Sequence, residues 1–232
     1  MNIKTSCLCL IGAACLAAAC ASTPVVAGAE SEAERLYLVG MAYLDDGSFE
    51  DAQEQFLKII SDFSYSKWEP FARIGLADSH FKREEFSAAR EIYKLFLQMR
   101  PGHELADWAA FQLGNCFFAE RPSDFWLLPP PEEKDLSDSV EKAVEHYRLY
   151  VRDHPQGKHI EDAKKSLAQA ETMLVSRELS VAEFYLKKDR CPAVRMRVAY
   201  IRQQFEKLFD DAPSPELQER LNALVARCPM DD

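Results

Sequence analysis

The sequence predicts an all-α fold of about five consecutive helical hairpins, and three observations indicate it. Small residues recur at a fixed spacing, since Gly40, Ala77 and Gly114 lie 37 residues apart. Ala52 and Ala89 follow the first two of them after twelve residues, and an aromatic residue comes four residues later in both. Apolar residues in between return every three or four positions, as on one helix face. Because one hairpin cannot cover its own apolar face, the hairpins are expected to stack into an array.

The composition narrows the classes of function. Of the 232 residues 47% are hydrophobic, which is enough to bury a core, and the formal net charge is -10. Scattered cations in an acidic chain argue against nucleic-acid binding and against a polybasic membrane patch. There is no Gly-rich phosphate loop, no Gly-x-Ser-x-Gly and no His-Glu-x-x-His. The chain is therefore predicted not to be an enzyme, with no catalytic residue, no cofactor and no metal.

Two alternatives to an inert array involve chemistry. His154 and His159, with Asp153 and Glu161 nearby, could form a metal site, although a solvated turn is the simpler explanation. A superhelical lytic transglycosylase would share the helical repeats, but no catalytic domain is appended to the array.

Residues 1–19 are predicted to form a lipoprotein signal peptide. Lys4 gives it a positive start, and the apolar stretch that follows is too short to span a membrane. Three alanines precede Cys20 and resemble a bacterial lipobox, so Cys20 is the expected lipidation site. Residues 20–29 follow as a flexible tether, which leaves residues 30–232 for the helical array.

There are two alternatives for the processing of this segment. Cleavage by ordinary signal peptidase near Ala19 or Ala27 would leave no lipid. Cys15 is a poorer lipidation candidate, because cleavage before it would leave a very short apolar core. With Cys20 acylated, each buried CH₂ contributes roughly 0.8 kcal/mol, so three chains would anchor the protein firmly. Ala21, in the place of an Asp, is compatible with sorting to the outer membrane.

The repeats can be followed along the chain. The first hairpin is predicted over residues 30–63 and the second over residues 67–99. The third begins near His103, and an insertion over residues 120–136 separates its two helices, because Pro129 to Pro131 forbid a helix there. Four apolar residues of the insertion either fold back over the array or dock a partner, namely Phe125, Trp126, Leu127 and Leu128.

Three more helices are predicted over residues 158–188, 192–209 and 214–227. The last two would form an antiparallel pair that caps the array, with Ser214 at the start of the final helix. Such a pair brings Cys191 and Cys228 to the same end, so a disulfide is expected in an oxidising compartment. Cys116 lies on an apolar helix face and is expected to be a buried thiol.

The spacing of the hairpins resembles the tetratricopeptide repeat family, whose unit is about 34 residues; a helical bundle with chance periodicity is the alternative. Three features occur together with the repeats: the lipobox, the insertion in the third repeat, and the segment Ser-Val-Ala-Glu-Phe-Tyr from Ser180 to Tyr185. This combination resembles the BamD family, lipoprotein subunits of the β-barrel assembly machinery. Phe125-Trp126 and the short segment before Ser137 depart from the family pattern.

The resemblance implies a periplasm-facing scaffold, lipid-anchored in the outer membrane. Its partners would be the barrel-forming subunit, the accessory lipoproteins of the same machinery and unfolded outer-membrane proteins, without nucleic acid. The alternative is another tetratricopeptide lipoprotein, such as a pilotin-like factor for secretin or pilus assembly or a coordinator of the envelope.

In such arrays the first helix of each hairpin lines a concave groove for peptides. Helical spacing gives the inward positions as Tyr37, Met41, Leu44, Ile74, Asp78, Phe81, Trp108, Phe111, Asn115 and Phe118. This composition suits a peptide with an aromatic anchor, and Asn115 could bind its backbone. A terminal-carboxylate clamp of Lys and Asn is not expected, because Tyr37 and Met41 occupy those positions. The alternative for any one of these residues is packing between repeats.

Overall fold

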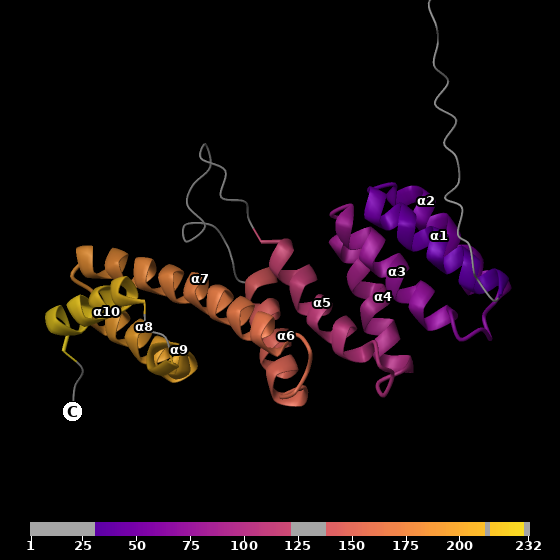
Figure 1. Ribbon diagram of the computed structural model, residues 1–232. Helices are drawn as coiled ribbons and strands as arrows, with labels where there is room; N and C mark the ends of the chain where they lie inside the picture. The colour runs from indigo at the N-terminus through magenta and orange to yellow at the C-terminus, as the bar shows by residue number, and fades with distance from the viewer. Residues whose placement is uncertain (1–30, 122–137, 212–213, 230–232) are drawn as a thin grey trace, which may run out of the picture.

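The computed structural model describes residues 31–121, 138–211 and 214–229, and every regular element in those ranges is a helix (Figure 1). In chain order they are α1 (Glu32–Asp46), α2 (Phe49–Asp62), α3 (Glu69–Lys82), α4 (Phe86–Met99), α5 (Ala106–Ala119), α6 (Ser139–Asp153), α7 (Ile160–Lys187), α8 (Cys191–Gln204), α9 (Glu206–Asp211) and α10 (Pro215–Arg227). The predicted all-α class is confirmed.

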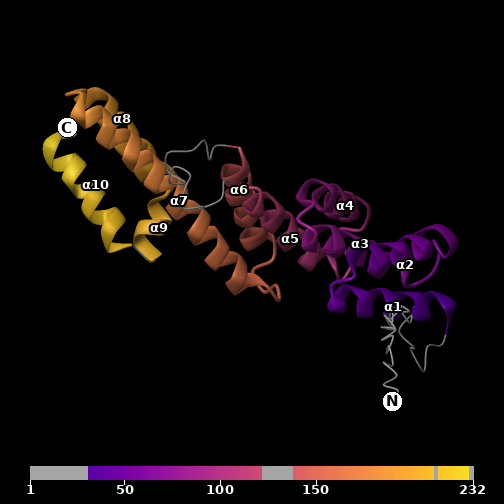
Figure 2. The ribbon, with the colours of Figure 1, turned by 90° about the horizontal axis from the view of Figure 1, so that it is seen from above.

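The helices form an elongated row of consecutive hairpins (Figures 1 and 2). Each helix from α1 to α8 packs on the next one along the chain, and α1 also touches α3. The last helix folds back, because α10 packs on both α7 and α8. The arrangement is the predicted stack of hairpins closed at its C-terminal end.

Small residues face large rings at the helix crossings, as the repeat pattern predicts. A Cβ added to Gly40 of α1 would stand 2.7 Å from the Phe56 ring, and one added to Gly75 of α3 would stand 2.5 Å from it. Phe56 therefore fills the space between two hairpins. Gly114 meets Tyr147 in the same way, at 2.6 Å. The close approach of the helix axes depends on the missing side chains.

The hairpin turns repeat as well. Gly47, Glu84 and Asp189 adopt a left-handed backbone with φ of 82°, 62° and 53°. Each lies seven residues after the small residue of its repeat pattern, namely Gly40, Ala77 and Ala182. The equivalent place in the third repeat is Arg121, where the insertion begins. The left-handed residue lets the chain reverse after the first helix, so it is a structural part of the repeat.

One predicted helix is wrong, since residues 192–209 are not continuous. α8 ends at Gln204 and α9 begins at Glu206, with Phe205 buried between them. Because of the break, the Phe205 side chain is buried in the same core as that of Leu208. Arg148 of α6 donates a hydrogen bond of 2.8 Å to the Gln204 carbonyl, so a carbonyl at the break has a partner.

Other boundaries agree with the prediction to within a few residues. Ser214 precedes α10 as expected, but it makes no side-chain cap; its carbonyl instead accepts from the Gln218 amide at 3.1 Å. The signal peptide, Cys20, the tether and the insertion from Pro122 lie outside the described residues. Among the residues that are described, no helix combines the length and the hydropathy needed to cross a membrane.

Candidate functional site

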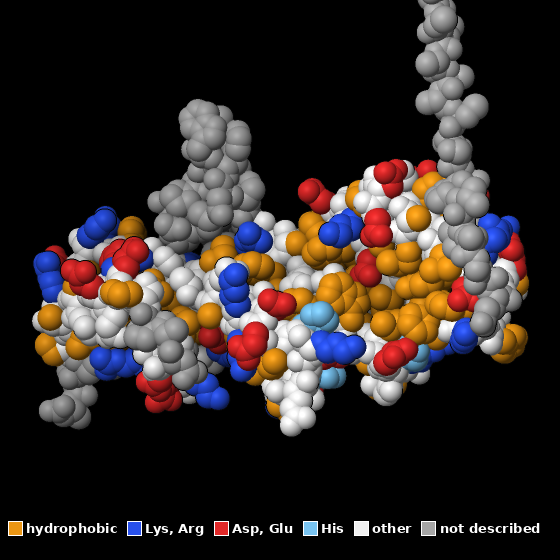
Figure 3. Space-filling view, viewed as in Figure 1, with side chains coloured by type: hydrophobic (Ala, Val, Ile, Leu, Met, Phe, Trp, Pro, Cys, Tyr) orange, Lys and Arg blue, Asp and Glu red, His pale blue; other side chains and the backbone are white. Residues whose placement is uncertain are grey.

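A groove between the first three hairpins is the main candidate site. Its cavity of about 470 Å³ lies between the ends of α1 and α3, the start of α2, and α5. The lining residues are Leu44, Asp45, Asp46, Gly47, Phe49, Asp78, Phe81, Lys82, Trp108 and Gln112. Figure 3 shows hydrophobic side chains gathered over the half of the molecule that carries α1 to α4. Four predicted groove residues are thus brought together, namely Leu44, Asp78, Phe81 and Trp108.

Asp78 is the polar centre of this groove. Its Oδ1 accepts hydrogen bonds from the Tyr93 hydroxyl and from the Trp108 indole nitrogen, the latter at 3.0 Å. Burial raises the pKa of the Asp78 carboxyl, and these hydrogen bonds oppose part of that rise. Tyr93 is fully buried in the second hairpin, so Asp78 ties that core to the first helix of the third. The carboxylate is held in place before any ligand arrives.

Two predicted groove residues are nearly covered. Ile74 and Phe111 are only 4% and 8% exposed. Phe111 stacks on His159, with ring centroids 5.3 Å apart, and lies against Tyr147 and Tyr150. Both residues therefore serve the core, and truncating Phe111 would test stability more than binding. Helical spacing placed them on the inner face but could not show that neighbouring repeats cover them.

The remaining predicted positions stand apart from the cavity. Tyr37 stacks on Trp68 at 5.0 Å, next to Phe71, and burial raises its pKa. Met41 packs with the first-hairpin core. Asn115 is engaged inside the chain, since it donates to Gln112 at 2.5 Å and accepts from the Tyr147 hydroxyl at 2.7 Å. These hydrogen bonds compete with the expected role of Asn115 toward a peptide backbone.

Phe118 lies at the far end of α5. The Arg121 guanidinium stands 4.3 Å from its ring centre, and Arg121 also donates to the Phe118 carbonyl at 2.9 Å. Phe118 also packs against the cores of the third hairpin and of the C-terminal unit, with its ring centroid 6.3 Å from that of Tyr147. Phe118 therefore serves the packing at the end of α5 and does not line the cavity.

Helical spacing alone does not predict the rim of the groove. Asp45, Asp46 and Phe49 line the cavity, because the α1–α2 turn points toward α3 and α5. The signal was present in the sequence as an acidic pair directly before the turn glycine, Gly47. The position of this acidic pair over the groove depends on how the second and third hairpins stack.

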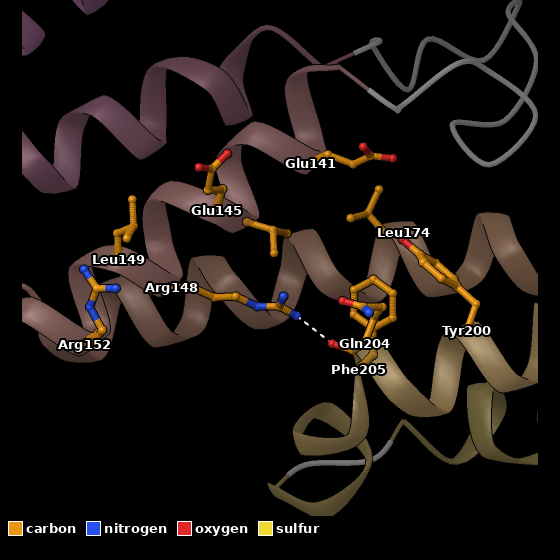
Figure 4. Close-up of a pocket in the computed structure, with 10 residues that line it drawn as sticks. Glu141, Glu145, Arg148, Leu149, Arg152, Leu174, Tyr200, Gln204 and Phe205 are labelled. Atoms are coloured by element: carbon orange, nitrogen blue, oxygen red, sulfur yellow. Dashed lines mark hydrogen bonds between the residues drawn. The ribbon is translucent and has the colours of Figure 1, made fainter.

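A second cavity of about 350 Å³ lies between α6, α7 and α8 (Figure 4). Arg148 crosses it, donating to Glu171 at 2.6 Å and to the Gln204 carbonyl. Glu171 is 7% exposed, whereas the Arg148 side chain is 42% exposed, so only the carboxylate side of this ion pair is held away from water. Arg148 bridges the cavity from α6 to α7 and to the end of α8, which makes the cavity a joint between the third hairpin and the C-terminal unit.

The C-terminal unit is fastened by polar contacts and a disulfide. Cys191 and Cys228 are joined by a disulfide across a sequence separation of 37. Arg220 of α10 donates to Glu183 at 2.8 Å, to Ser176 at 3.1 Å and to Ser180 at 3.0 Å. Ser180 and Glu183 belong to the segment Ser-Val-Ala-Glu-Phe-Tyr, so part of that motif holds the last helix.

His154, His159 and the free cysteine Cys116 are engaged in packing. His159 packs against Trp108 and Phe111, and His154 stacks on Tyr150. Over the described ranges, no three His, Cys, Asp or Glu side chains are placed to hold a metal ion. Burial raises the pKa of the Cys116 thiol to about 12, so it stays protonated and unreactive at neutral pH.

Comparison with known proteins identifies the family. A family model described as "YfiO: Outer membrane lipoprotein" matches residues 29–226. The outer membrane protein assembly factor BamD of Pasteurella multocida is 23% identical over 175 residues, which cover 74% of this chain and 66% of the relative. The BamD protein of Vibrio cholerae is 21% identical over 193 residues, which cover 83% of this chain and 78% of the relative. That of Caulobacter vibrioides is 24% identical over 167 residues, which cover 72% of this chain but only 52% of the relative.

The family match spans the array from the start of the first hairpin into α10, and so it includes the groove and the fastened C-terminal unit. The matched segments leave a third or more of two of these relatives uncovered. On the family match, the chain belongs to the YfiO/BamD family of outer membrane lipoproteins.

Proposed function

We propose that this protein is an assembly factor for outer-membrane proteins, acting as a non-catalytic scaffold. The family match over residues 29–226 carries the proposal, and the relatives are named as assembly factors of this kind. In this proposal the array holds the barrel-forming subunit and its accessory lipoproteins, and an acylated Cys20 anchors it to the outer membrane, facing the periplasm.

The groove between α1, α3 and α5 receives segments of unfolded outer-membrane proteins. Its apolar side chains offer a seat for an aromatic residue, and Asp78 supplies a fixed acceptor inside it. Ligand grooves of this kind combine an apolar lining with few, well-placed polar groups. Nothing in this role requires a bond to be made or broken in the cargo.

Substitution of the groove residues tests the cargo role. The probe is a fluorescent peptide with the sequence of the last strand of an outer-membrane porin. Leu44→Ala combined with Phe81→Ala should weaken its binding about thirtyfold or more, because two central apolar anchors that each contribute more than about 1 kcal/mol are removed together. Leu95→Ala with Met99→Ala is the matched control on α4, where both side chains are exposed, and it should bind like the parent. If both double variants lost peptide binding equally, the groove would not be the peptide-binding site.

The partner and the anchor are tested in the cell envelope. A pulldown from detergent-solubilised envelope should recover the barrel-forming subunit, and recovery of a secretin in its place would support the pilotin-like alternative. Cys20→Ser should move the protein out of the membrane fraction if acylation is its anchor. Retention of that variant in the membrane would show that protein contacts suffice.

A further inference from the structure

The rim of the groove carries carboxylates without cationic partners. Asp45 and Asp46 are exposed at the end of α1 and line the cavity. Within the described part of the chain, no Lys or Arg pairs with either carboxylate, and Asp46 accepts only a 3.4 Å contact from the Ser48 hydroxyl. Acidic residues close by are treated differently, since Glu50 is paired with Arg83 at 2.8 Å.

The position of the acidic pair at the end of α1 strengthens the negative electrostatic potential at the rim. The carboxyl end of a helix carries partial negative charge, and α1 has no basic residue in its last turn to offset it. Asp78 lies deeper in the groove, where burial raises the pKa of its carboxyl, so the negative charge at the mouth comes from the rim. Lys82 is the one ammonium among the lining residues. The α1 terminus, Asp45 and Asp46 therefore all favour a cation at the mouth of the groove.

The floor of the groove sets a second requirement. Leu44, Phe49, Phe81 and Trp108 line it with aliphatic and aromatic surface. An apolar side chain of the ligand would enter there and leave its chain neighbours at the acidic rim. The two features together describe a seat for a large apolar residue next to a positive charge.

We infer that the groove selects segments in which an aromatic or large aliphatic residue is flanked by Lys or Arg, as part of an unfolded polypeptide. The inference rests on the proposed function and specifies its cargo. Acidic neighbours of the apolar residue are repelled by the rim. Like charges brought together in an interface suppress the wrong partners.

Three amidated, fluorescently labelled peptides test this selectivity on the whole protein. They share one sequence with a central Phe, flanked by Lys in the first, Glu in the second and Gln in the third. At low salt the Lys peptide should bind about tenfold more tightly than the Glu peptide, with the Gln peptide between them, since two exposed charge contacts change sign. In about 1 M salt, where the Debye length is about 3 Å, the difference should almost vanish.

Two double variants separate the rim from the overall negative charge. Asp45→Asn with Asp46→Asn should remove most of the preference for Lys. Glu54→Gln with Glu91→Gln removes the same charge from exposed positions of α2 and α4, outside the groove lining, and should keep the preference. Circular dichroism of both variants checks that the helices are intact. A preference lost equally in the two would assign it to net charge and overturn the inference.

The remaining outcomes divide between the two proposals. If all three peptides bind alike and Phe81→Ala weakens each of them, the groove binds peptides but the charge selection is refuted. If no peptide binds, the proposed cargo role of the groove falls together with the selectivity.

Discussion

The first two hairpins and the C-terminal unit both bury small residues between helices, but they treat their apolar faces differently. In the first two hairpins the packing rule is a small residue against a large ring, since Gly40 and Gly75 both face Phe56. In the C-terminal unit the small residue Ala182 is buried in the core that α7, α8 and α10 share. In α1–α4 the inner face stays partly open and lines a groove. In α7–α10 the final helix lies back over the array, held by Arg220 and by the disulfide Cys191–Cys228.

The difference shows how a repeat array divides its tasks. The second hairpin lies between two others and is supported on both sides, so it can leave part of one face available to a ligand. The last repeat of the array has one neighbour only, and its apolar face is covered by other means. Here α10 provides the cover, and its residues Leu217, Leu221 and Leu224 join the core of α7 and α8.

The largest effect is expected at Phe56, where one ring serves two hairpins. Phe56→Ala should lower the free energy of unfolding by about 3–5 kcal/mol, because the ring is fully buried between Gly40 and Gly75. Leu57→Ala is the control on the next residue, whose side chain is 52% exposed, and it should change stability by less than about 0.5 kcal/mol. Urea denaturation followed by circular dichroism measures both. Similar midpoints for the two variants would contradict the packing rule.

The disulfide should matter locally. Replacing Cys191 and Cys228 by Ser is expected to lower stability by about 2–4 kcal/mol, since the bridge restricts a long segment of the unfolded chain. Because repeats are stabilised chiefly by their neighbours, the loss should appear in α8 and α10 and leave α1–α4 unchanged. Hydrogen exchange read by mass spectrometry distinguishes these regions, and α1–α4 serve as the internal control. Uniformly faster exchange along the chain would show that the unit is not separable.

The smallest effect concerns the repeated turn. Gly47→Ala should cost about 1 kcal/mol, because Gly47 adopts φ of 82°, although a Cβ there meets nothing within 4 Å. Gly102→Ala is the matched control, since a Cβ added at Gly102 also meets nothing within 4 Å and the backbone there is not left-handed. Glu84→Gly, at the equivalent turn with φ of 62°, should stabilise the protein by a similar amount. Thermal denaturation measures the stability of all three variants. If Gly47→Ala and Gly102→Ala lowered the melting temperature equally, the role of the turn would be refuted.

The sequence predicted the groove only in part. Leu44, Asp78, Phe81 and Trp108 were assigned from helical spacing, and they do line one cavity. Phe111 had the same spacing but is covered by His159, which lies 48 positions later in the chain. Spacing shows which way a side chain leaves its own helix. It carries no information about which distant side chain arrives on top of it.

The sequence by itself determined the hairpin repeat, because a small residue and a ring at fixed helical spacing suffice to specify close helix crossings. It also predicted the pairing of Cys191 with Cys228, which two antiparallel helices bring to one end. Only the tertiary structure decided the break at Phe205 and the acidic rim above the groove. These features arise where separate repeats meet, and burial at such a junction depends on the whole stack and not on the local pattern.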